Sequence, residues 1–401
     1  MYRLEMKRLA KSRSTWILSA AAVLIAILMC CINVFNSYEY INYTGETLRG
    51  LAAIEYKREI GEKSEGDWTP ERIRDVFAGI QGAMSTCGSG SIPKEVNDEF
   101  IEPYVGTFMY RIPQVYGSLY SEGLAPEEAE QYYTQRKAYI NETTMLRYDA
   151  NIAKAALKLD ESTAEPFYWE FGFGTGSDTQ TVLPICLFAV AVACSVICAP
   201  VFASDYSTGA DDIQRSSLHG RGRLGKARIL AAVTLSTGMY LICVAVFLVI
   251  TLAVFGADRT SAQLALDAMV LGDMSMNEVL VLALVSGLLS VLAMTAFTLW
   301  LSARMKSGVA VIAISLAVVM TPTFILILMR NTMIGDWIRL LLPSGGLGLG
   351  TGMFVDIQSG KFLTLGSLAI WTPFAMLAAP VIEAPVFALL AKRAYVRHEC
   401  A

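Results

Sequence analysis

Residues 181–203, TVLPICLFAVAVACSVICAPVFA, form an apolar run, and the polar, basic stretch DYSTGADDIQRSSLHGRGRLGKAR follows at 205–228. A second apolar run, residues 229–255, comes directly afterwards. A helix that crosses a membrane needs about 20 apolar residues, so both runs are long enough to span. The stretch between them must then lie in water at a membrane face. This alternation predicts an all-α polytopic membrane protein.

The composition of the whole chain agrees with this prediction. Of the 401 residues, 54% are hydrophobic and only 17% are charged, whereas soluble proteins carry about 25% charged residues. The charges are unevenly distributed: residues 37–180 hold 24 acidic and 13 basic side chains, and the remainder of the chain is net basic. An acidic external domain with basic internal loops would produce this division.

Six segments are apolar enough to span, and the basic residues between them predict the orientation. Clusters of Lys and Arg precede the first span and follow the second, the fourth and the sixth, whereas the loop at 256–276 holds only Arg259. The positive-inside rule then places both termini in the cytoplasm of a cell-membrane protein. The predicted spans are 16–35, 181–203, 229–255, 277–302, 308–329 and 366–391.

The first loop, residues 37–180, is predicted to be a large, mainly helical extracellular domain. Thr69-Pro70-Glu71 is typical of a helix start, with a capping residue, proline in the first turn and an acidic neighbour. A second helical stretch is expected from Pro126 to about Asp160. The glycine-rich residues 171–176 are predicted to form a hinge into the second span.

Three further segments lie outside the spans and the insert. Residues 1–15 favour a basic amphipathic helix along the inner membrane surface, in contact with lipid; the alternative is simply the start of span one. Residues 330–365 contain a short apolar helix and the glycine-rich SGGLGLGTG at 344–352. They form either an extracellular loop or a re-entrant segment, because irregular backbone at membrane depth must be packed in protein. Residues 392–401 are a cytoplasmic tail.

No motif for catalysis, metal binding or nucleic-acid binding is evident. Gly220–Lys226 resembles a phosphate-binding loop, but Ala227 stands where a Ser or Thr would hold magnesium, and no buried strand precedes it. Cys194 and Cys198 lack the companion ligands of a zinc site. We therefore expect neither an enzyme nor a bound cofactor.

Glu383 is the one acidic residue that lies well inside a predicted span, between Pro380 and Pro385. Acids within a membrane are costly and often functional. Two interpretations are open: a functional intramembrane carboxylate, or a structural acid that snorkels or pairs with Lys392.

The order of these features resembles the permease subunits of ABC-2-type exporters. The basic start before span one, the large insert and Leu342-Pro343 before span six match that family's layout. After span two, the family signature contains an acid, a glycine, an arginine and a lysine. In this chain the corresponding residues are Asp205, Gly209, Arg221 and Lys226. Ala210 replaces the usual Thr, and His219-Gly220 replaces the usual turn with proline.

The resemblance implies a transport subunit without an ATPase of its own. Such a subunit pairs with a second permease copy or homologue and with a cytoplasmic ABC ATPase subunit that binds the ATP. The coupling loop at 204–228, through Asp205, Gly209, Arg221 and Lys226, would dock the ATPase together with the N-terminal helix. The cargo would be a drug, a peptide or a lipid.

Two other classes of function are also open. A membrane sensor would bind a ligand in its extracellular domain and would need a signalling partner. An intramembrane enzyme would use Glu383 and would work without ATP.

Overall fold

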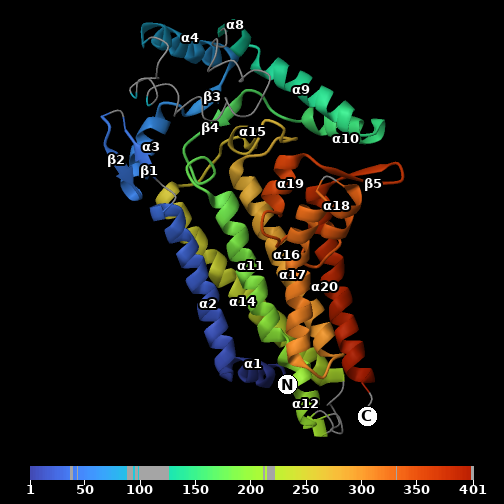
Figure 1. Ribbon diagram of the computed structural model, residues 1–401. Coiled ribbons are helices and arrows are strands. Elements are labelled where there is room, and N and C mark those ends of the chain that lie inside the picture. Colours follow the sequence, from blue (N-terminus) through green and yellow to red (C-terminus); the bar gives the residue numbers. More distant parts are fainter. Residues whose placement is uncertain are drawn as a thin grey trace.

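The computed structural model describes residues 1–36, 39–42, 44–87, 94, 98, 126–210, 213–214, 222–330 and 332–398. The chain is mostly helical, with a bundle of long helices and an insert that covers one end of it (Figure 1). The insert lies between α2 and α11. The opposite end of the bundle carries α1, α12 and the N-terminus, and we refer to it as the terminal end.

Six helices are long and apolar enough to cross a membrane, which fits a multi-pass membrane protein. Each corresponds to one of the six predicted spans. Two of them continue into a second helical piece, because α2 is followed by the π-helix η1 (Ile32–Asn36) and α11 by α12 (Pro200–Thr208). The six are α2 (Arg13–Cys31), α11 (Thr179–Cys198), α14 (Gly222–Phe255), α16 (Met276–Ser302), α17 (Gly308–Leu328) and α20 (Thr372–Arg397).

The predicted loop at 204–228 is much shorter in the structure. Helix α12 continues to Thr208 and α14 already begins at Gly222, so both ends of the predicted loop are helical. Gly209 ends α12 in the left-handed conformation, with φ +68°. A glycine adopts this conformation without a steric penalty.

The helices differ in how much of their apolar surface is covered. In α11 and α16, 67% and 61% of the most apolar window is buried, against 28% in α2, 22% in α17 and 17% in α20. The open faces of the outer helices are themselves apolar; Ile327 on α17 and Phe374 on α20 are well exposed. Apolar surface of this extent fits contact with lipid.

The insert is built of helices and two small antiparallel sheets. One sheet pairs β1 with β2 and the other pairs β3 with β4. One helix begins at Pro70 as expected, but the stretch predicted from Pro126 to Asp160 consists of three helices, α8, α9 and α10. The elements are β1 (Glu39–Ile41), β2 (Thr47–Arg49), α3 (Leu51–Glu62), β3 (Gly66–Trp68), α4 (Pro70–Cys87), α8 (Pro126–Ala129), α9 (Tyr132–Arg147), α10 (Ala150–Asp160) and β4 (Phe167–Trp169).

Arg136 of α9 fixes the insert to the loop between α14 and α16, which contains the short helix α15 (Ala262–Ala265). Its guanidinium donates to the carbonyl oxygens of Ala268, at 2.8 Å, and Val270, at 2.9 Å. It also pairs with Asp160 at 2.8 Å, and both side chains are buried. This contact holds the insert against the bundle.

Residues 171–176, the predicted hinge, fold around the buried Asp258 of the same loop. Its Oδ2 accepts hydrogen bonds from the backbone amides of Gly174, at 2.8 Å, and Thr175, at 2.9 Å. At Gly172 a Cβ would lie only 2.4 Å from the Ala257 carbonyl oxygen. The segment is therefore tightly packed, and glycine is needed for this close approach.

The segment between α17 and α20 enters the bundle. It contains α18 (Met333–Leu340), α19 (Met353–Ser359) and a hairpin of β5 (Phe362–Leu365) and β6 (Leu368–Trp371). The backbone amide of Gly346 donates to Ser290 Oγ of α16 at 3.3 Å, and Ser344 Oγ donates to the Val318 carbonyl of α17 at 2.6 Å. Both partners lie near the middle of their helices. Residues 341–352 therefore reach about half-way along the bundle as irregular backbone packed in protein.

Candidate functional site

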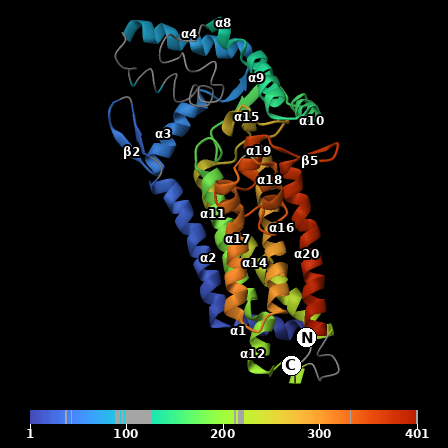
Figure 2. The same cartoon turned by 45° about the vertical axis from the view of Figure 1, so that its right-hand side comes forward.

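Three elements that are distant in sequence meet at the terminal end of the bundle. Helix α1 (Tyr2–Lys11) lies across this end, beside the first turns of α14 and the helix α12 that extends α11 (Figures 1 and 2). The last described residue, His398, is also there, because its ring stacks on that of Tyr206 with centroids 4.1 Å apart.

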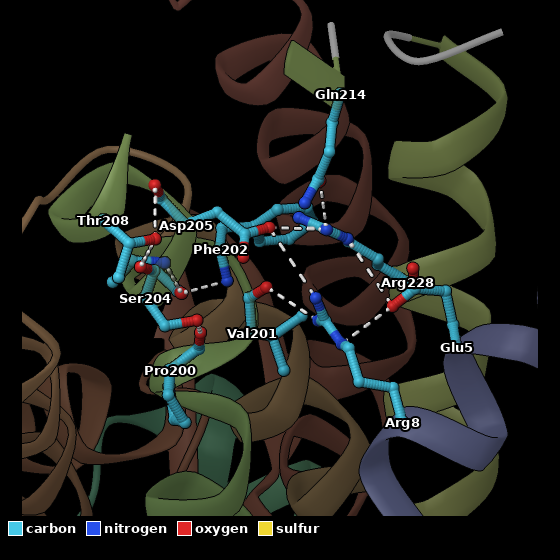
Figure 3. A network of polar contacts seen from close by, with 12 residues as sticks. Glu5, Arg8, Pro200, Val201, Phe202, Ser204, Asp205, Thr208, Gln214 and Arg228 are labelled. Carbon is cyan, nitrogen blue, oxygen red and sulfur yellow. Dashed lines mark hydrogen bonds and ion pairs between the residues drawn. The ribbon is translucent and has the colours of Figure 1, made fainter. Parts of the chain in front are cut away.

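Four charged side chains from these elements form one network, shown in Figure 3. Arg228 of α14 pairs with Asp205 of α12 at 2.5 Å and lies 3.6 Å from Glu5 of α1. Arg8 of α1 pairs with Glu5 at 3.1 Å and lies 3.6 Å from Asp205. We call Glu5, Arg8, Asp205 and Arg228 the charge network. Its two positive and two negative charges balance.

Hydrogen bonds from the two arginines to neutral acceptors complete the network. Arg8 donates to the Val201 carbonyl at 3.0 Å, and Arg228 donates to Gln214 Oε1 at 2.6 Å. The guanidinium of Arg228 also lies over the rings of Phe202 and Tyr395, 5.6 and 5.7 Å from their centroids. Such cation–π contacts stabilise a cation away from water. The C-terminal part of α20 is thus joined to the same group through Tyr395.

The network is largely removed from solvent. Only 1% of the Arg228 surface is exposed, and Glu5 and Asp205 are 9% and 8% exposed. Burial lowers the pKa of Arg8, and repulsion from Arg228 lowers it further, while Glu5 and Asp205 act in the opposite direction. Removing one partner of a buried ion pair destabilises a folded protein by about 3–5 kcal/mol, because the other charge stays buried without its counterion. The three elements therefore depend on one another to keep these charges buried.

An apolar cluster packs beside the network. Leu9 of α1, Phe202 of α12, Ile229 of α14 and Tyr395 of α20 are all buried in it. At Gly225 of α14 an added Cβ would lie 2.9 Å from the Tyr395 ring, so the two helices approach closely there. The network and this cluster together form one packed layer across the terminal end, which we call the terminal layer.

The four residues predicted to dock a partner lie in different environments. The Asp205 carboxylate faces Arg228 within the protein, so it holds helices together instead of being presented to solvent. Gly209 and Lys226 are exposed, and Lys226 stands on α14, not in a loop. Arg221 lies outside the described residues.

Sequence reasoning missed Glu5, Arg8 and Arg228 as members of the site. In the sequence Arg228 indicates only the orientation of the spans, and its partner Glu5 lies more than 200 residues away. One signal was available: Glu5 and Arg8 stand three residues apart, which brings them together on one face of a helix.

Glu383 lies near the middle of α20 and is half-buried. Its Oε2 is buried and accepts no hydrogen bond, and no ion pair joins it to Lys392 within the described part of the chain. The interpretation as an acid paired with Lys392 therefore has no support in the structure.

The described residues contain no group of three His, Cys, Asp or Glu side chains that could hold a metal ion. Five of the described cysteines are buried free thiols in or beside the spans: Cys30, Cys186, Cys194, Cys198 and Cys243.

Neither a scan against protein-family models nor a search among curated proteins found a match to this chain.

Proposed function

We propose that this chain is the transmembrane permease subunit of an ATP-driven ABC exporter, with ATP bound and hydrolysed by a separate subunit. The observation that carries the proposal is the charge network of Glu5, Arg8, Asp205 and Arg228. It ties the surface helix α1 and the adjoining ends of two spans, α11 with α12 and α14, into one unit. A force applied to that unit would move both spans together.

The terminal end has the charge expected of a cytoplasmic face. Exposed Arg and Lys side chains stand there on both α1 and α14, for example Lys7 and Lys226. In contrast, the loop between α14 and α16 at the other end holds only Arg259 as a basic residue. This asymmetry supports an orientation with the terminal end in the cytoplasm, where an ATPase would be located.

The proposed coupling depends on the ion pairs and buried contacts that join the helices of the terminal layer. An ATPase that docks against α12, Gly209 and Lys226 would push on the terminal layer, whose charges are paired and, apart from Arg8, buried. The movement would then pass to α11 and α14. Since α11 is the most buried of the six helices, its displacement would repack the centre of the bundle and switch the pathway for cargo. A second permease subunit would complete that pathway.

The test is recovery of the partner with the intact chain. The tagged protein is isolated from membranes of its native host, and co-purifying ATPase is identified by mass spectrometry. We expect Lys226→Glu to reduce ATPase recovery about tenfold, which corresponds to about 1.4 kcal/mol of binding. The matched control is Arg330→Glu, which reverses an exposed positive charge just beyond α17, at the other end of the bundle.

Recovery of an ABC ATPase that depends on Lys226 but not on Arg330 would support the proposal. Absence of any ABC ATPase, or equal recovery with both variants, would contradict it. A signalling protein recovered in place of the ATPase would favour the sensor function instead.

A further inference from the structure

Glu383 is the one charged residue that lies away from the ends of the six spans. It stands near the middle of α20. The nearest basic residue further along that helix, Lys392, is nine positions away, or about 13 Å along the axis at 1.5 Å per residue. An ionised carboxylate at this depth is costly unless it is compensated. The described residues supply no hydrogen bond to its buried Oε2.

Two prolines flank Glu383 on α20 and free two backbone carbonyls of this helix. A proline inside a helix has no N–H, so the carbonyl four residues earlier loses its partner. Pro380 and Pro385 lie within α20 and therefore free the carbonyls of Met376 and Val381. Met376, Pro380 and Glu383 are spaced i, i+4 and i+7, so they share one face of the helix. The Oε2 of Glu383 is an acceptor without a donor among the described residues, which selects for a cation or a proton donor.

The surroundings favour an organic cation over a metal ion. Glu383 is a single carboxylate, and no group of three possible metal-binding side chains occurs in the described residues. One turn further along α20, Phe387 packs against Phe297 and Trp300 of α16, with ring centroids 5.2 and 5.6 Å apart. Aromatic faces attract delocalised or alkylated cations. They do not provide the oxygen ligands that hard metal ions need.

The position is also reachable from the side of the bundle. Helix α20 is the least buried of the six, and its residues Val381 and Ile382 are 54% and 64% exposed. Glu383 lies between this open face and the face packed on α16. A ligand dissolved in the bilayer could approach the carboxylate without passing through the core of the bundle.

We infer that Glu383 is the charge-selecting residue of a binding site for a lipophilic monovalent cation on α20. The inference rests on the proposed transport function, which it deepens by naming the class of cargo. A permanently charged amphiphile would pair its cation with the carboxylate and place its apolar groups against Phe387 and lipid. Anionic and neutral amphiphiles would gain nothing from Glu383.

The probe is radiolabelled tetraphenylphosphonium, measured with the purified full-length chain in phosphatidylcholine nanodiscs, with empty nanodiscs as background. We expect saturable binding, at least tenfold weaker in Glu383→Gln and partly retained in Glu383→Asp. The matched control, Glu142→Gln, removes an exposed acid of the insert and should leave binding unchanged. Triphenylphosphine oxide, which is neutral, should show no dependence on Glu383.

A second measurement uses the unaltered protein, so it does not depend on the folding of a variant. Dicyclohexylcarbodiimide, a hydrophobic reagent for carboxyl groups, should label Glu383, and tetraphenylphosphonium should slow this labelling severalfold. Labelling of Glu383 that the cation does not slow, no saturable binding to the unaltered chain, or equal binding to Glu383→Gln would each overturn the inference. Neither assay contains an ATPase, so such a failure leaves the ATPase-recovery test of the proposed function standing.

Discussion

Arg228 Nη2 lies 2.5 Å from Asp205 Oδ2, which joins the first turns of α14 to the helix α12 that ends the preceding span. The two residues are separated by a polar stretch of chain, yet the contact between them is buried. The network around this pair connects the helices α1, α12 and α14 through ion pairs between charged side chains. Its stability should therefore depend strongly on charge balance.

Replacing Arg228 by Met should destabilise the protein by about 3–5 kcal/mol, because Asp205 and Glu5 would keep one counterion between them. The double variant Asp205→Asn/Arg228→Met restores the balance and should lose less than the sum of the single losses, by about 0.5–3 kcal/mol. Thermal unfolding in detergent measures both effects. Arg3→Met, on the exposed side of α1, is the control and should stay within about 0.5 kcal/mol of wild type. Strict additivity would contradict a coupled network.

Gly346→Ala should destabilise the protein by about 1–3 kcal/mol through overpacking. An added Cβ would lie 2.6 Å from Ser286 Oγ and 2.8 Å from Ser290 Oγ, both on α16. Gly238→Ala in α14 is the matched control, since its Cβ would meet nothing within 4 Å. This control should be neutral or stabilising by up to about 1 kcal/mol, the difference in helix propensity. Equal melting temperatures for the two variants would argue against the packed position of residues 341–352.

Asp258→Asn should cost about 1–3 kcal/mol, because its NH2 group would face either the amide donors of Gly174 and Thr175 or that of Thr260. The cost should also depend on pH. Burial raises the pKa of Asp258 above its ordinary value of 3.8, and its hydrogen bonds only partly oppose this shift. The folded chain then binds a proton at pH values where the unfolded chain has lost it.

Stability therefore falls as pH rises from about 3.8 through the raised pKa, and this part of the pH dependence is missing in the Asn variant. The difference in melting temperature between wild type and variant should narrow over that window and stay constant above it. A difference that widens with pH would show that the carboxylate is favoured in its charged form.

Arg136→Met should loosen the insert, because Asp160 would remain buried without its counterion and the carbonyls of Ala268 and Val270 would lose their donor. We expect a loss of about 3 kcal/mol or more and faster limited proteolysis within α9 and α10. The neighbouring Lys137→Met removes an exposed pair with Glu165 and should cost at most about 1 kcal/mol. Unchanged proteolysis of Arg136→Met would contradict the docking role of this residue.

The six spans were predictable because a bilayer imposes a minimum apolar length, and each helix that meets it appears in the sequence as a long apolar run. Their ends were less predictable. The polar residues 204–208 and 222–228 were assigned to a loop, but they continue α12 and α14. There the charges are stabilised by partners on other elements, as for Asp205 with Arg228, and such pairing cannot be inferred from local polarity.

Of the four residues of the charge network, only Asp205 is among the site residues that the sequence predicts. Asp205 begins the polar stretch after span two, and it lies at the centre of the network, in contact with both Arg8 and Arg228. Arg8 and Glu5 come from a segment about 200 residues earlier, so only the folded chain brings them together. The strands of the insert were also missed, because pieces of three or four residues such as Gly66–Trp68 carry too short an alternation to recognise.

The glycine-rich segment at 341–352 has a consequence for how the protein is made. Residues 344–352 are too short and too irregular to enter a bilayer alone, since their backbone groups would face hydrocarbon without partners. Ser290 Oγ of α16 accepts from the backbone amide of Gly346, and the Val318 carbonyl of α17 accepts from Ser344 Oγ. During synthesis these two helices must already stand side by side before the segment can take its place. Insertion of residues 344–352 is therefore a late step of biogenesis. Ser344 and Gly346 can reach their packed positions only after α16 and α17 have assembled correctly.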